Sequence, residues 1–67
     1  MGFGENLKAE RQRMELTQQK LAAKVGVTPA AIAQYELGVK SPSIVTASRI
    51  AEALEITVDE LLHGRKE

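Results

Sequence analysis

The segment QQKLAAKVGVTPAAIAQYEL, residues 18–37, has the pattern of two short helices joined by a tight corner. Thr17 can cap the first helix, because its hydroxyl oxygen can accept a bond from an unpaired N–H of the first turn. Gly26 ends that helix, since glycine adopts left-handed backbone angles without strain. Thr28 and Pro29 begin the second helix as its N-cap and first residue. The segment therefore predicts a rigid corner that holds the second helix outward.

Apolar residues in this segment recur at helical spacing, so that each helix has one face for a core. They are Leu21, Val25, Val27, Ile32 and Tyr35, with the small Ala22 where the two helices approach each other. Together with Gly26, this pattern resembles the helix-turn-helix of phage repressors and Cro proteins. The resemblance runs from about Phe3 to Leu62 and includes LTQQKLA, GVTPAAIAQYELG, the SPS turn and IAEALEITVDELL.

The segments on either side of the motif also predict helices. The first runs from near Phe3 to Met14, with apolar residues turned inward. A turn at 40–43 leads into another helix, in which apolar residues keep helical spacing from Ile44 to Leu54. The resemblance implies the same architecture. It is all-α, a compact bundle of five short helices, and a lambda-repressor-like DNA-binding domain with a central helix-turn-helix.

The fifth helix is predicted by a capping box of Thr57 and Glu60, in which each side chain bonds the other residue's backbone N–H. The tail over 64–67 is expected to fray. Glu15 and Glu55 stand where similar proteins commonly have the glycine that closes a helix. If they adopt left-handed angles, the strain is about 1 kcal/mol each.

Composition limits the kinds of protein that this chain can be. Its 67 residues include no cysteine, so we expect one domain over 1–67, ordered at about 3–62 and held by packing alone. Without a long apolar run or a signal-peptide pattern, we expect a cytoplasmic protein with no membrane contact. No cofactor, metal or small-molecule ligand is evident. The single histidine, His63, lies near the chain end, and no nucleophile and base converge, so an enzyme is not predicted.

Charge gives only weak support to nucleic-acid binding. The formal net charge is zero, which argues against a nonspecific DNA clamp, because phosphate contacts dominate such binding. Residues 1–33 carry five basic and three acidic side chains, whereas residues 34–67 carry four and six. The half that contains most of the motif is therefore the more positive one, although small asymmetries of this kind are common on solvated helices.

By resemblance, the second helix of the motif lies in the major groove of DNA, where each base pair shows a distinct pattern of groups. The residues implied to face base edges are Thr28, Pro29, Ala30, Ala33 and Gln34. Gln34 can make a bidentate contact to adenine, whereas Ala30 and Ala33 offer methyl contacts suited to thymine. High helix propensity explains the alanines equally well.

The resemblance also implies contacts to DNA phosphates. The residues are Gln18, Arg11, Lys40, Ser41 and the backbone N–H near Val39. Arg11 is further implied to form an ion pair with Glu36, because an unpaired buried guanidinium is costly; the alternative is an arginine that extends to water. Leu37 and Val39 replace the polar or basic residues usual in this loop, which either weakens the phosphate grip or marks a protein contact.

These features predict a sequence-specific DNA-binding transcriptional regulator, a repressor or controller that binds a palindromic operator as a homodimer. Four apolar residues near the chain end are predicted to form the dimer interface, because one short helix can bury only some of them. They are Ile56, Val58, Leu61 and Leu62, and the alternative is that they close the core of a monomer. The second class of function is a protein-binding helix-turn-helix module, such as an antitoxin or anti-repressor-like subunit.

Overall fold

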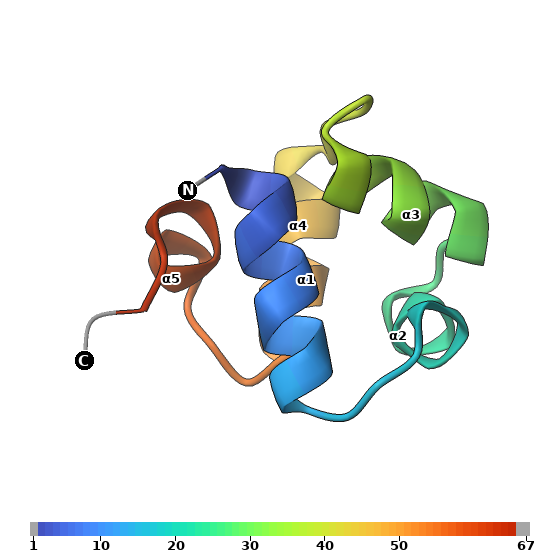
Figure 1. Cartoon of the computed structure of the whole chain (residues 1–67), viewed down its shortest axis with the longest axis horizontal. Helices are drawn as coiled ribbons and strands as arrows, with labels where there is room; N and C mark the ends of the chain where they lie inside the picture. Colours follow the sequence, from blue (N-terminus) through green and yellow to red (C-terminus); the bar gives the residue numbers. More distant parts are fainter. Residues whose placement is uncertain (1, 66–67) are drawn as a thin grey trace.

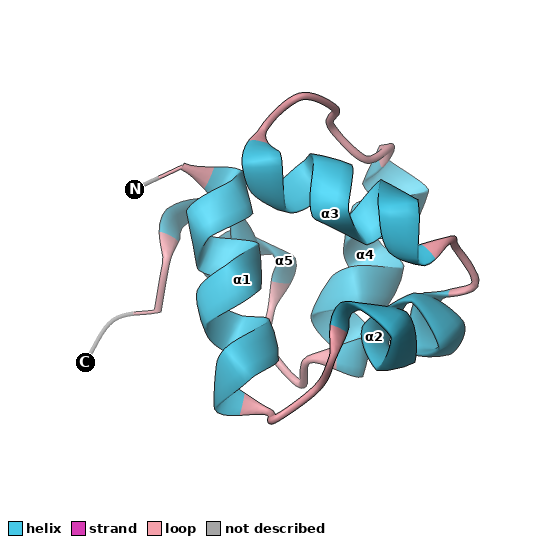
Figure 2. Cartoon of the chain, turned by 45° about the vertical axis from the view of Figure 1, so that its right-hand side comes forward, coloured by secondary structure: helices cyan, strands magenta, loops and turns pink. Residues whose placement is uncertain are grey.

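Five helices account for most of residues 2–65, the part of the chain that the computed structural model describes (Figures 1 and 2). They are α1 (Phe3–Arg13), α2 (Gln18–Val25), α3 (Pro29–Leu37), α4 (Ile44–Ala53) and α5 (Val58–His63). No strand occurs between residues 2 and 65. The predicted all-α bundle of five short helices is confirmed, and α1 ends one residue before the predicted Met14.

Short polar side chains fix the starts of four helices. In each case the hydroxyl oxygen accepts a hydrogen bond of 3.0 to 3.1 Å from the backbone N–H three residues later. The capping residues are Thr17, Thr28, Ser43 and Thr57. The predicted capping box is present, since Thr57 N–H donates to Glu60 Oε1 at 2.9 Å. These bonds satisfy donors that a helix cannot satisfy internally.

Left-handed residues fix the ends of four helices. Gly26 and Gly38 have φ values of 87° and 77°, which glycine adopts without strain. Glu15 and Glu55 have φ values of 56° and 60°, as expected from their replacement of the usual glycine. A left-handed backbone angle costs about 1 kcal/mol at each of these two residues, because the Cβ atom crowds the backbone.

The core lies between all five helices. In Figure 1, α5 lies on one side of α1, α2 and α3 lie on the other, and α4 lies behind. Helix α1 packs on α3 and α5, while α4 packs on α2 and α5. The buried cluster comprises Leu7, Leu21, Ala22, Val25, Ile32, Ile50, Ala51, Leu54 and Leu61. Both helices of the motif are therefore anchored from one face only, which leaves the outer face of α3 open.

Two buried polar residues of α1 hold the end of the chain. Asn6 Nδ2 donates to the Leu61 carbonyl at 3.2 Å, which ties α1 to α5. Glu10 accepts from Arg13 Nε at 2.7 Å and from Arg65 Nε at 2.9 Å. The sequence predicts fraying from residue 64, but the structure holds Arg65 against α1. Residues 66 and 67 lie outside the described part of the chain.

Candidate nucleic-acid interface

Helix α3 turns one face into the core and the opposite face outward. Ile32 is fully buried and Tyr35 packs against the core cluster. On the outward side, Thr28, Pro29 and Ala30 are exposed, and Ala33 and Gln34 are half-buried. The five residues predicted to face DNA bases therefore all retain accessible surface, four of them on α3 and Thr28 at its N-cap.

A buried ion pair fixes the end of α3 against α1. Arg11 Nε donates to Glu36 Oε2 at 2.6 Å, and Arg11 Nη2 donates to Glu36 Oε1 at 3.2 Å. The two side chains are 11% and 4% exposed, respectively. The structure thus contains the ion pair that the resemblance implies, and Arg11 does not extend to water.

Two residues predicted to contact phosphate, Arg11 and Gln18, belong to a cluster of hydrogen bonds around Glu36. Arg11 Nη1 donates to the Leu16 carbonyl at 2.8 Å, so all three guanidinium nitrogens bond within the fold. Gln18 Nε2 donates to Glu36 Oε1 at 3.1 Å. The cluster therefore aligns α1, α2 and α3, and a phosphate contact from either residue has to share a donor group with these bonds.

In the loop after α3, the backbone N–H predicted to contact phosphate has a partner within the fold. The Val39 N–H, expected to face phosphate, donates instead to the Gln34 carbonyl at 3.1 Å, because it closes the end of α3. Its side chain is exposed and apolar. Lys40 and Ser41 are exposed, so their side chains are accessible to a partner molecule.

Two residues near the outward face of α3 were not predicted from the sequence to contact DNA. They are Lys8 and Leu37. Both line a surface hollow with Arg11, Gln18 and Ala33, at the junction of α1, α2 and α3. Leu37 is 77% exposed and lies one turn beyond Ala33 on α3. The signal was available for Leu37, since it continues the helical spacing of Ala30 and Ala33.

The predicted dimer interface is only partly on the surface. Leu61 is 0% exposed and belongs to the core, and Ile56 packs against that core. The assignment of Leu61 to the surface was wrong, because α5 turns it under α1. Val58 and Leu62 are exposed and line an apolar hollow with Ile44 at the start of α4. Phe3, Pro42, Ala47 and Ser41 complete the lining of that hollow.

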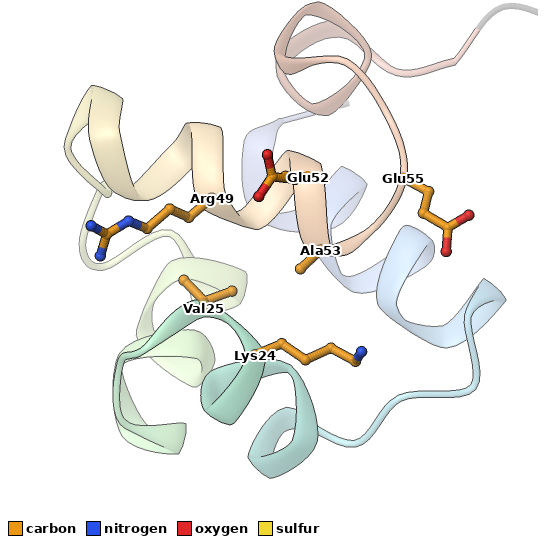
Figure 3. Close-up of a pocket in the computed structure, with 6 residues that line it drawn as sticks. All are labelled: Lys24, Val25, Arg49, Glu52, Ala53 and Glu55. Carbon is orange, nitrogen blue, oxygen red and sulfur yellow. The ribbon is translucent and has the colours of Figure 1, made fainter.

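A separate groove lies between α2 and α4 (Figure 3). Lys24 and Arg49 extend from its two sides, and Glu52 and Glu55 lie along α4 and the residues after it. Val25 and Ala53 also line it. None of its lining residues comes from α3. Among residues 2–65, no group of three potential ligands is placed to hold a metal ion, and no helix is long and apolar enough to cross a membrane.

Comparison with known proteins identifies the family. A helix-turn-helix family model matches residues 7–61. This chain belongs to the helix-turn-helix transcriptional regulators. It is 44% identical over 62 residues to the uncharacterized HTH-type transcriptional regulator YqaE of Bacillus subtilis, covering 92% of this chain and 53% of YqaE. The chain thus spans about half the length of the curated relatives it first matches.

Solved structures show the same fold. The P22 c2 repressor in complex with a synthetic operator superposes with a TM-score of 0.92 at 31% identity, covering 97% of this chain and 98% of that chain. Hydroxypropylphosphonic acid epoxidase from S. wedmorenis also matches, with a TM-score of 0.84 and 31% identity. The match covers 91% of this chain but only 32% of the epoxidase. The family model and the named regulators identify a DNA-binding regulator family rather than an enzyme family.

Proposed function

We propose that this protein regulates transcription in the cytoplasm as a homodimer that binds a palindromic operator, with α3 of each copy in the major groove. The observation that carries the proposal is the outward face of α3, held rigidly at both ends. Thr28 caps its start, and Glu36 ties its end to Arg11. The P22 c2 repressor, which has the same fold, was solved with operator DNA.

The predicted contacts divide into two kinds. Thr28, Pro29, Ala30, Ala33 and Gln34 would face base edges and select the sequence. Lys40, Ser41, Gln18 and Arg11 would meet the phosphates and position the helix. Gln18 and Arg11 supply this contact through N–H groups beside those that bond Glu36, since amide and guanidinium groups carry several donors.

The proposal is tested by selecting duplexes from a random library at low salt. We expect one enriched sequence with two inverted half-sites whose centres lie about 34 Å apart, one helical turn of DNA. DNase footprinting on genomic DNA upstream of the gene should protect a matching sequence. A library that shows no enrichment over many rounds, with a folded protein, would count against DNA binding.

The dimer surface that we propose differs from the set of residues predicted from the sequence. With Leu61 in the core, the exposed apolar residues left near the chain end are Val58 and Leu62, which share one hollow with Ile44 of α4. A two-fold axis through this hollow would place identical residues against each other. Burial of their apolar surface would stabilise the pair, and DNA would strengthen it by holding both copies on one duplex.

A protein-binding module is the second candidate, because Leu37 at the end of α3 and Val39 in the loop after it expose apolar side chains. In this alternative the alanine-rich face of α3 docks into another protein. The duplex selection separates the two candidates, since a protein-binding module would enrich no DNA sequence.

A further inference from the structure

The outward face of α3 carries a row of apolar side chains. Helical spacing places Ala30, Ala33 and Leu37 along one line, and Gln34 flanks it. The charged residue of α3, Glu36, is buried in its pair with Arg11. The row has no group that can bind phosphate or hydrogen-bond a base, so apolar contact is the interaction open to it.

Polar and basic groups border this row. Ala33 and Leu37 line their hollow together with Lys8 and Gln18, and Lys40 is exposed in the loop after α3. An apolar protein surface pressed onto the row would leave these groups desolvated. A DNA duplex fits better, because its phosphates would meet the cationic and amide groups while base edges meet the row.

In the major groove, the apolar group that a base pair presents is the C5 methyl of thymine. We propose that Leu37, together with Ala30 and Ala33, reads thymine methyl groups. The DNA bound is then a class of A·T-containing half-sites recognised through methyl contacts, with Gln34 contacting adenine. From Ala30 to Leu37 the row extends roughly 10 Å along the helix, the length of about three base-pair steps. The inference rests on the proposed DNA binding through α3.

The test replaces each thymine of the selected operator with deoxyuridine, one position per half-site at a time. This change removes a methyl group and leaves base pairing intact. For the unaltered protein we expect affinity to fall about fourfold at each contacted thymine, the value for burying one carbon-sized apolar group. With Leu37→Ala, the loss should disappear at the thymine that Leu37 contacts and remain at the others.

Two further variants separate a direct contact from a general effect. Leu37→Met keeps an apolar side chain and should keep the wild-type pattern. Val45→Ala trims an exposed apolar side chain from α4 and should leave the sensitivity to every thymine unchanged. Because Leu37 is exposed, thermal unfolding of Leu37→Ala should match that of wild type, and Leu37→Gln provides a second variant with the same expected loss.

The outcomes are distinct. If deoxyuridine has no effect at any thymine, or if Leu37→Ala and Leu37→Gln retain the full wild-type pattern, the methyl-reading role is overturned while operator binding stands. If no sequence binds better than random DNA, the proposed function fails and takes this inference with it. A loss of sensitivity at one thymine in the Leu37 variants alone establishes the contact.

Discussion

The Arg11 guanidinium holds three parts of the chain together. It bonds both oxygens of Glu36 and the carbonyl of Leu16, all from a position that is 11% exposed. Removing one member of such a pair leaves the other charge buried and unpaired, which is more damaging than removing both. We therefore expect Arg11→Met and Glu36→Met each to lower the free energy of unfolding by about 3 kcal/mol.

The double variant Arg11→Met/Glu36→Met should lose much less than the sum of the two single variants. Urea unfolding of all four proteins gives the coupling free energy from a double-mutant cycle. Lys8→Met is the matched control, because it removes an exposed cation from the same helix. Purely additive losses would mean that the pair does not form in solution.

Gly4 is required by the close approach of α1 to the end of α3. A Cβ at this position would lie 2.7 Å from the Tyr35 carbonyl oxygen and would also collide with the Glu36 carbonyl oxygen. Both are backbone atoms, so neither can rotate away. Although alanine favours a helix over glycine by about 1 kcal/mol, we expect Gly4→Ala to destabilise the protein by about 1–3 kcal/mol.

Thermal unfolding measures this effect, with Gly2→Ala as control. At Gly2 the nearest atom to an added Cβ is Glu5 Oε1 at 3.9 Å, an ordinary contact. A Gly4→Ala protein that is as stable as wild type, or more stable, would show that the two helices can move apart without loss.

At the scale of whole helices, the ends of α1 and α4 contain removable strain. The second residue after each helix, Glu15 or Glu55, is a glutamate with a left-handed backbone angle. Glycine at Glu55 would relieve the clash between Cβ and the backbone, so we expect Glu55→Gly to raise the free energy of unfolding by about 0.5–1 kcal/mol. Glu52→Gly, three residues earlier within α4, should lower it by about 1 kcal/mol. Equal losses in urea unfolding would refute the strain at Glu55.

Helix boundaries were predictable because the signals that set them act over a few residues. Thr17 and Thr28 cap helices through bonds to the residue three positions on, and Gly26 and Gly38 act through their own backbone angles. The corner of the motif could therefore be predicted before any tertiary contact was known.

Surface assignments were harder to predict because they depend on distant contacts. Leu61 looked like part of an apolar excess, but Asn6 bonds its carbonyl from 55 positions earlier and draws α5 onto α1. The backbone N–H of Val39 was expected to be free for a phosphate, but it donates to the Gln34 carbonyl at the end of α3. The position of Arg65 was also unpredictable, because its partner Glu10 is far away in the sequence.

At the scale of the molecule, dimerisation is expected to depend on the hollow between α4 and α5. Ile44→Glu and Val58→Glu would each place a charge in it and should prevent pairing, because an unpaired charge is costly to bury. Val45→Glu, the exposed neighbour on α4, should leave pairing unchanged. The hollow is small, so we expect the wild-type dimer to have a dissociation constant of about micromolar. Sedimentation that shows a monomer up to millimolar concentration would exclude this interface.

The central claim is that α3 reads DNA sequence, and the ratio of affinities for the selected operator and for random DNA tests it most directly. For each half-site, Gln34→Ala should lower that ratio roughly 5- to 150-fold, because the loss of one base contact costs about 1–3 kcal/mol. Lys40→Ala should weaken both DNAs equally and leave the ratio unchanged, since a phosphate contact carries no sequence information. If Gln34→Ala weakens operator and random DNA by the same factor, Gln34 does not read a base and the account of α3 is contradicted.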